Sequence, residues 1–215
     1  LFTDRRGGGR KQKRANLIDL ARHLATTPAA SKAAQPHFKL GRFGKVKSDK
    51  GSYRTNANFR AVTGLEGDYD DGHVSPDEAA AMLDAARVAA LIVTSASNGQ
   101  PGKGHRWRVL CPLSAEVKPE DRAALVARLN GALGGILGTE SFTAAQSYGY
   151  GHVAGRPAPE VRLIEGRYLD EAGDLDAGAV GKPAKADLGD PEPAVDQSDD
   201  PAAVAHACIR LEAVA

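Results

Sequence analysis

Three carboxylates recur at every second position in one short stretch of the chain. Glu66, Asp68 and Asp70 lie within residues 64–72, directly after the apolar pair Ala61-Val62. Because side chains alternate between the two faces of a strand, a strand here would project all three from one face. Like charges on one face are unfavourable unless a cation neutralises them, and Mg²⁺ prefers such oxygen ligands. The spacing predicts a metal site for phosphoryl transfer, although a solvated strand end that runs into an Asp-Asp-Gly turn also explains it.

A second set of charged side chains follows on residues 105–112. Alternation in a strand puts His105 and Trp107 on one face, and Arg106 and Arg108 on the other. Two arginines on one strand face can bind phosphate through bidentate hydrogen bonds. An exposed strand face that forms salt bridges with nearby acids is the alternative. His105 follows a glycine-rich loop and precedes the two arginines, which makes it a phosphate-binding candidate as well.

Residues 36–60 interleave aromatic side chains with cations. Single-stranded nucleic acid or a nucleotide requires rings on which bases stack and cations that meet phosphates. The alternative is that Phe38, Phe43 and Phe59 belong to the core and that only the cations face water. The cations of this stretch that we expect to contact nucleic acid are Lys45, Lys47, Arg54 and Arg60.

The segments after the acidic stretch favour a helix and a second strand. Residues 75–78 have the form of a helix start, with Ser75 as N-cap and Glu78 three residues later. An apolar stripe continues to about Val88, and the β-branched run 90–95 predicts a buried strand. Strand, helix and strand at this spacing predict a right-handed crossover unit with the two strands parallel.

Four further segments complete the expected sheet and its cover. Apolar residues at helical spacing predict a short amphipathic helix over 17–24, lying on the sheet, and a longer helix over 119–137. Residues 140–151 join an acid, a polar turn and a tyrosine strand, for which an edge strand with aromatics packed on the sheet is the simpler explanation. Residues 161–165 predict a last strand.

Length and composition allow one core with a tail, because the chain has 215 residues of which 42% are hydrophobic. Cys111 and Cys208 lie far apart without a paired-cysteine motif, which argues against a zinc knuckle and a disulfide-built fold and suits a cytoplasmic setting. We expect no membrane span and no signal peptide, since no apolar run is long enough. The 5% aromatic content favours a monomer. Because the first residue is Leu rather than Met, we expect a fragment or a processed chain.

The net charge of +1 conceals charges that are sorted along the chain. Residues 1–60 hold 15 Lys and Arg against 3 Asp and Glu, whereas residues 170–204 hold 2 against 10. A basic segment suits a polyanion, and an acidic Pro/Gly/Ala-rich tail is typical of a solvated, disordered-like linker. We therefore expect a basic arm and short helix over residues 1–35, a folded domain over 36–169, and an acidic linker with a short C-terminal helix over 170–215. Residues 1–14 should add nothing to the core and be ordered only by a partner.

In order and spacing, these motifs resemble the catalytic domain of the archaeo-eukaryotic primase (AEP) superfamily, in particular the primase-polymerase domains of phages and plasmids. Asp68-Tyr69-Asp70 matches the family's Asp-x-Asp motif. The hydroxyls of residues 93–95, followed after a variable loop by the basic strand 105–109, are similar to its second motif of Ser and His. Arg54, with two asparagines after it, also resembles a feature of the phage proteins. The compact Ser-x-His of the family is absent, and Glu140 stands where the family generally has Asp.

The resemblance implies an α+β fold with an RRM-like βαβ catalytic core over residues 36–169, in which a mixed sheet is flanked by helices. It implies template-directed nucleotidyl transfer by a two-metal mechanism, as in a DNA primase or DNA polymerase of phage or plasmid replication. Asp68 and Asp70 would be catalytic and would hold Mg²⁺ or Mn²⁺, with Glu140 or Glu66 as third ligand. The nucleotide-binding residues would be Ser95 or Thr94, His105, Arg106 and Arg108.

The same resemblance implies the partners of the reaction. These are a single-stranded DNA template and an NTP or dNTP, in a bacterial or phage-infected cell. A helicase domain or helicase protein is a further candidate. The basic front of the chain would carry the template strand, with an affinity that falls steeply as salt rises.

Two other functions fit part of the pattern. A non-catalytic nucleic-acid-binding module of a replication initiator would use the basic front and incorporate nothing. A metal-dependent nuclease or topoisomerase-primase-type site also combines Glu with Asp-x-Asp. That site normally places its Glu on a strand well upstream, and no acid in an apolar strand precedes Ala61.

Overall fold

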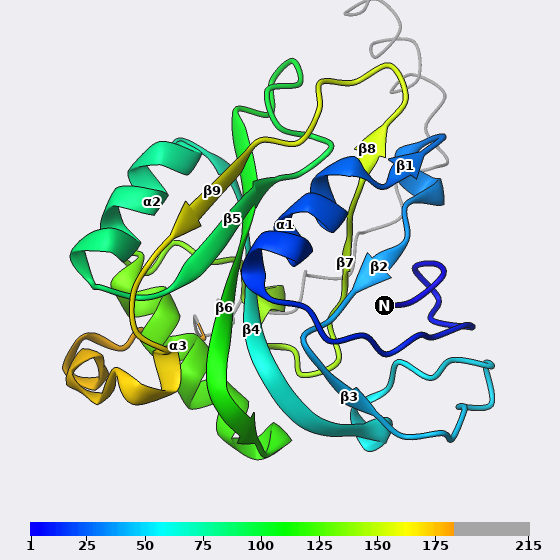
Figure 1. Ribbon diagram of the computed structural model, residues 1–215, viewed down its shortest axis with the longest axis horizontal. Helices are drawn as coiled ribbons and strands as arrows, with labels where there is room; N and C mark the ends of the chain where they lie inside the picture. The colour runs from blue at the N-terminus through cyan, green and yellow to red at the C-terminus, as the bar shows by residue number, and fades with distance from the viewer. Residues whose placement is uncertain (183–215) are drawn as a thin grey trace, which may run out of the picture. The chain divides into compact units, whose positions relative to one another are not determined.

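A five-stranded sheet in the order β3-β4-β6-β5-β9 forms the centre of the computed structural model, which describes residues 1–182 (Figure 1). Its strands are β3 (Gly41–Phe43), β4 (Phe59–Gly72), β6 (His105–Val117), β5 (Ala90–Thr94) and β9 (Val161–Ile164). Each neighbouring pair is antiparallel, so β4 and β5 run parallel to each other with β6 between them. The sequence-predicted parallel orientation of these two strands is therefore confirmed.

Two smaller sheets lie beside the central one. The strands β1 (Pro28–Ala29) and β8 (His152–Val153) pair in parallel, whereas β2 (His37–Phe38) and β7 (Tyr148–Gly149) pair antiparallel. The fold is α+β with mixed sheets flanked by helices, as the sequence predicts.

Helices cover both faces of the central sheet. On one face α1 (Leu17–Thr26) packs through Ala21 and Leu24 into a cluster with side chains of β5 and β6. On the other face α2 (Pro76–Ala85) and α3 (Arg122–Ala132) cover the larger core. Figure 1 shows α1 in front of the sheet, with α2 and α3 at its other side. The expected helix over 17–24 is confirmed.

Local chemistry explains where the two helices of the larger core begin and end. Ser75 and Glu78 form a capping box at the start of α2, as predicted. Both helices end earlier than the apolar pattern predicts. Arg87 has a φ of 54°, so α2 stops at residue 85 instead of 88, and glycines at 134 and 135 with φ of 74° and 84° follow α3, which therefore stops short of residue 137.

The N-terminal arm packs on this unit, which corrects the expectation that residues 1–14 add nothing to the core. The Phe2 side chain is only 4% exposed, and its ring centroid lies 5.2 Å from that of Phe43. The Phe2 N–H donates to the His37 carbonyl at 2.7 Å, and Arg10 donates to the Phe43 carbonyl at 2.9 Å. One buried ring in an otherwise polar arm is sufficient to anchor it.

Residues 169–178 also pack on the domain, where the sequence predicts a linker from residue 170. They form two 3₁₀ helices, η5 (Leu169–Glu171) and η6 (Gly173–Gly178). Ala172 is fully buried, and Arg128 of α3 lies 2.8 Å from Asp176. The rest of the expected linker and the expected C-terminal helix lie outside the described residues. Within residues 1–182, no helix is both long and apolar enough to cross a bilayer.

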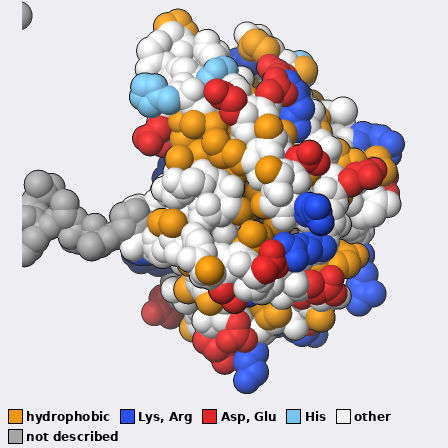
Figure 2. Space-filling view, turned by 90° about the vertical axis from the view of Figure 1, so that its left-hand side faces the viewer, with side chains coloured by type: hydrophobic (Ala, Val, Ile, Leu, Met, Phe, Trp, Pro, Cys, Tyr) orange, Lys and Arg blue, Asp and Glu red, His pale blue; other side chains and the backbone are white. Residues whose placement is uncertain are grey.

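On the side that carries α2 and α3, acidic and basic side chains are intermixed. Figure 2 shows red and blue groups scattered over this face, with orange hydrophobic groups between them. Such a surface offers a polyanion no extended field of one sign.

A buried ion cluster ties three parts of the chain together at the middle of β4. The carboxylate of Glu66, which is fully buried, lies 2.6 Å from the Lys39 ammonium and 3.2 Å from the Arg122 guanidinium. It also accepts a hydrogen bond from the backbone N–H of Leu40. Burial lowers the pKa of Lys39 to about 8, against the opposing effect of the Glu66 charge. The cluster therefore joins β4 to α3 and to the segment between β2 and β3.

Replacement of this buried carboxylate tests the cluster. We expect Glu66→Gln to lower the free energy of unfolding by about 3–5 kcal/mol, because two buried cations would lose their anion. Urea unfolding measures the loss. The control is Glu116→Gln, which removes the exposed partner of Arg42 and should change stability by less than about 1 kcal/mol. Equal, small losses in both variants would show that the buried cluster contributes little.

Candidate active site

Two aspartates of β4 face two arginines of β6 across the sheet. Asp68 lies opposite Arg108 in the register of the two strands, and its carboxylate is 2.7 Å from the Arg108 guanidinium. Asp70 lies 2.5 Å from Arg106. All four side chains lie on the face that carries α1, together with Glu66 and Leu110, which also oppose each other. The predicted grouping of Glu66, Asp68 and Asp70 on one face, and of Arg106 and Arg108 on one face, is confirmed.

The third predicted acid lies next to this pair. Glu140 belongs to η4 (Thr139–Phe142), which is fixed to Asp68 from both sides. The Gly138 N–H donates to the Asp68 carbonyl at 2.9 Å, and the Asp68 N–H donates to Ser141 Oγ at 3.0 Å. Burial raises the pKa of Glu140, and the charges of Asp68 and Asp70 raise it further. The Glu140 carboxylate therefore lies close enough to Asp68 and Asp70 for their charges to act on it.

The donor chemistry of this cluster suits a hard cation, because three carboxylates supply only oxygen ligands. Asp68 and Asp70 are instead directed at their arginines. In the arrangement of residues 1–182, no three His, Cys, Asp or Glu side chains already form a metal-binding group. Binding of a metal would require the aspartates to exchange their arginine partners for it.

Two further cations that the sequence does not predict belong to the same cluster. Lys32, on η1 (Lys32–Ala34), donates to Ser97 Oγ at 2.6 Å, and burial together with the charges of Arg108, Arg156 and Arg106 lowers its pKa. Arg156 donates to the Ala96 carbonyl. Both residues thus line the loop that connects β5 to β6. Neither lies in a recognisable motif, so the sequence gives no signal for them.

An aromatic floor holds the Arg108 side chain in place. Its guanidinium carbon lies 5.3 Å from the centroid of the Tyr148 ring, and its Nη1 donates to the Gly149 carbonyl at 2.5 Å. On the opposite face of the sheet, the rings of Tyr69 and Trp107 stack with centroids 4.7 Å apart. This stack fastens β4 to β6 directly beneath the charged pairs, so the acids and arginines are presented from a rigid base.

Several predicted residues lie elsewhere. His105 is exposed and shares the other face of the sheet with Trp107, where its charge acts on Glu78. Thr94 pairs with Trp107 and is buried, so it is also separated from the acids. Glu66 is enclosed in its ion cluster and is not available as a third ligand. Strand alternation explains why His105 and Thr94 lie apart from the acids. Both side chains project from the sheet face opposite to the one that carries Arg106 and Arg108.

Ser95 remains next to the cluster. It follows β5 directly, and its N–H donates to the Arg106 carbonyl at 2.8 Å. Its hydroxyl oxygen accepts a hydrogen bond from the Ser97 N–H at 3.3 Å. Ser95 and Ser97 thus belong to one turn beside Arg106 and Lys32.

The cations expected to contact nucleic acid form a separate surface around the loop between β3 and β4. Lys45, Lys47 and Arg60 are exposed, and the Lys47 ammonium lies 4.9 Å from the centroid of the Tyr53 ring. Arg54 is only partly exposed. It donates to the carbonyls of Ala145 and Arg5, so it serves the packing of the arm.

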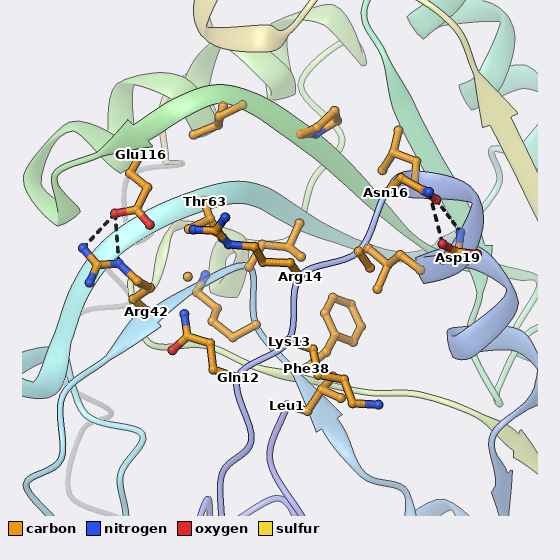
Figure 3. A pocket seen from close by; sticks show the side chains of 18 of the residues that line it. Leu1, Gln12, Lys13, Arg14, Asn16, Asp19, Phe38, Arg42, Thr63 and Glu116 are labelled. Carbon is orange, nitrogen blue, oxygen red and sulfur yellow. Dashed lines mark hydrogen bonds and ion pairs between the residues drawn. The ribbon is translucent and has the colours of Figure 1, made fainter.

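A groove of about 1010 Å³ lies on the α1 face of the sheet, between the N-terminal arm and the far halves of β4 and β6. Figure 3 shows the Arg42–Glu116 ion pair at one end of this groove and Asn16 with Asp19 at the other. The exposed cations among its lining residues are Lys11, Lys13, Arg14 and Arg42. Its floor contains apolar side chains such as Phe38. A basic rim over an apolar floor suits a flexible polyanion with rings.

One histidine of this region is held neutral. His37 Nδ1 lies 3.1 Å from Ser147 Oγ, and burial lowers the pKa of His37 to about 4, with the charges of Arg54 and Arg108 acting in the same direction. In the unfolded chain its pKa is near the ordinary histidine value of 6.5. Between these values the unfolded chain binds the proton more readily, so stability is present above the unfolded pKa and decreases as the pH falls through the interval.

His37→Gln should therefore weaken the acid sensitivity of the fold. We expect the difference in unfolding free energy between the wild type and this variant to shrink as the pH falls from about 6.5 to about 4. Thermal unfolding at a series of pH values measures that difference. His73→Gln, at an exposed histidine, should give a constant difference over the same range. A constant difference for His37→Gln as well would contradict a buried, neutral His37.

Comparisons with known proteins complete the description. Neither the models of protein families nor the curated proteins contain a match to this chain. Among solved structures, the chain is similar to the AEP domain of the primase-polymerase of cyanophage S-2L, at 14% identity and a TM-score of 0.46, covering 67% of this chain and 70% of that one. It is also similar to the polymerase domain of ligase D from Mycobacterium tuberculosis, solved in complex with DNA, at 18% identity and a TM-score of 0.37, covering 68% of this chain and 65% of that one. An AEP domain is thus among the structures that this chain resembles.

Proposed function

We propose that this protein is a metal-dependent nucleotidyltransferase that extends or primes a nucleic acid strand on a DNA template. One observation carries the proposal. Asp68 and Asp70 on β4 and Glu140 on the adjoining turn η4 lie beside a group of cations drawn from three parts of the chain. The cations are Lys32, Arg106, Arg108 and Arg156. A triphosphate with its divalent metal needs both kinds of group side by side.

Asp68, Asp70 and Glu140 are the residues that would hold Mg²⁺ or Mn²⁺. When bound, two such ions supply Lewis-acid activation of an attacking 3′-hydroxyl and neutralise charge on the leaving pyrophosphate. The ion pairs of the cluster keep both sets of side chains extended toward the same space. Arrival of a metal–triphosphate complex would give the carboxylates a cation and the arginines an anion, so no charge would be left without a partner.

The cations have separate tasks in this proposal. Arg106 and Arg108 would bind phosphate oxygens in bidentate geometry, and Lys32 would act as a point charge beside them. The Ser95 turn would add a hydroxyl. Arg108 is held on Tyr148, so its guanidinium is oriented before the nucleotide arrives. Because the β5–β6 loop bonds both Lys32 and Arg156, it would order the phosphate-binding groups together.

The basic surface and the groove would carry the template. Lys45 lines a hollow together with Arg10 and Gln12 of the arm, and Lys47 and Arg60 are exposed around the same β3–β4 loop. The RRM-like core and a role in phage or plasmid replication belong to the same proposal. They are supported by the Asp-x-Asp strand followed by a helix and a parallel strand.

Substitution of the two aspartates tests the chemistry. We expect Asp68→Ala and Asp70→Ala each to reduce template-dependent incorporation by at least about a hundredfold, because transition-state charge would lose its support. A gel-resolved extension assay with Mg²⁺ or Mn²⁺, with and without primer, measures it. Asp71→Ala is the matched control, since this neighbouring exposed acid has the opposite strand parity. Full activity of the Asp70 variant, or loss of DNA binding together with activity, would contradict a catalytic role.

A non-catalytic nucleic-acid-binding module is the second candidate. It is favoured by one observation, that both aspartates are already paired with arginines and form no ready metal group within residues 1–182. In that case the protein would bind DNA through its basic surface in a salt-sensitive way and ignore added metal and nucleotide.

The basic surface itself can be tested independently of catalysis. Combined substitution of Lys45, Lys47 and Arg60 by Ala should weaken binding to single-stranded DNA and reduce the slope of log affinity against log salt by about 2, since each lost phosphate contact contributes roughly 0.7. Fluorescence anisotropy at several salt concentrations measures the slope. Lys118→Ala, an exposed lysine at the end of β6, should leave it unchanged. An unaltered slope in the triple variant would place the DNA path elsewhere.

A further inference from the structure

Arg122 is a fully buried arginine that contacts both elements on which the acids stand. It begins α3 and is 1% exposed. Its Nη1 donates to the Ser141 carbonyl at 2.7 Å, within η4. Its Nη2 donates to the Glu66 carboxylate at 3.2 Å and lies 3.3 Å from the Glu66 carbonyl, both on β4. One planar guanidinium thus spans from the strand that carries Asp68 to the turn that carries Glu140.

The same two elements are joined a second time immediately beside the acids. The backbone of Asp68 is bonded on both sides, by the N–H of Gly138 and by the hydroxyl of Ser141. These two residues flank Glu140 in the chain. The position of Glu140 relative to Asp68 therefore depends on where η4 lies against β4, and Arg122 is the buried side chain that fixes that distance from beneath.

Glycine at 138 shows how closely this segment fits. A Cβ at this position would come within 2.6 Å of the Glu140 carboxylate, so the acid lies folded over its own turn. The carboxylate is therefore held near the backbone of its own turn, and a shift of η4 against β4 would change its distance from Asp68.

We infer that Arg122 is a positioning residue for the acidic centre, which holds η4 against β4 so that Glu140 meets Asp68 and Asp70 as a third metal ligand. This inference rests on the proposed function, because it assigns a task to the turn only if the three acids bind a metal together. Because Arg122 is only 1% exposed, it would contact neither nucleotide nor metal. It acts through Ser141 and Glu66, as outer-shell partners of metal ligands do.

A lysine at position 122 would keep the positive charge but could not contact both the Glu66 carboxylate and the Ser141 carbonyl. Its single ammonium could neutralise Glu66 but could not also donate in the plane to the Ser141 carbonyl. Arg122→Lys is therefore the principal variant. Arg128→Lys is the matched control, since Arg128 lies on the same helix and its guanidinium also contacts two groups. These groups are the Asp176 carboxylate and the Leu169 carbonyl, and neither belongs to the acidic centre.

The measurements are the dissociation constant for Mn²⁺, the unfolding temperature and the KM for nucleotide, all on the full chain. We expect Arg122→Lys to weaken Mn²⁺ binding by roughly tenfold, as outer-shell changes do, with KM for nucleotide at saturating metal little changed. Arg128→Lys should lower the unfolding temperature and leave Mn²⁺ affinity at the wild-type value. Ser141→Ala, which spares the Glu66 ion cluster, should weaken Mn²⁺ binding in the same direction.

The outcomes separate this inference from the proposed function. Folded Arg122→Lys with wild-type Mn²⁺ affinity overturns the inference and leaves the function standing. Should Arg122→Lys not fold, Arg122→Gln replaces it, since this variant leaves the buried Lys39–Glu66 pair charge-balanced, and wild-type Mn²⁺ affinity there overturns the inference instead. A wild-type chain that binds Mn²⁺ no better than its Asp70→Ala variant refutes the metal centre itself, and the inference with it.

Discussion

The fold depends on one buried charge in the middle of β4. Glu66 can be buried only because Lys39 and Arg122 meet it from two other segments, and each of these segments is fixed in turn by that contact. The cluster also sets the register of the strand. A slip by one residue would turn Glu66 toward the opposite core and present Tyr69 to the acid face. The position of Asp68 and Asp70 two and four residues later is therefore a consequence of where Glu66 is neutralised.

The two faces of the central sheet differ in composition, because successive side chains of each strand project to opposite faces. One face is apolar, with the Tyr69–Trp107 stack and the helices α2 and α3 closing the larger core. The other face carries acids and arginines at its open end and a smaller core under α1. Charges that would be costly beneath α3 are tolerated at the strand ends, where each has an opposite charge within hydrogen-bonding distance and water nearby.

Part of the site could be predicted because side chains alternate between the two faces of a strand with a period of two residues. The acids of β4 and Arg106 and Arg108 lie at alternating positions of two strands, and alternation holds in every strand whatever surrounds it. By the same rule His105, at an odd position of β6, lies on the other face of the sheet with Trp107. Only the resemblance to the AEP superfamily indicated Glu140 as a metal ligand. Lys32 carries no local signal, because it reaches the site through the packing of α1 and η1 on the sheet.

The sequence by itself determined the local features of this protein: strand parity, the capping box at Ser75, the α+β class and the sorting of charge along the chain. Each of these follows from residues within a few positions of one another. Only the tertiary structure decided which acid is buried and which is exposed to solvent, that Phe2 joins the core, and that the turn carrying Glu140, 72 residues after Asp68, lies beside it. These outcomes depend on contacts between distant segments, whose energies no short stretch of sequence contains.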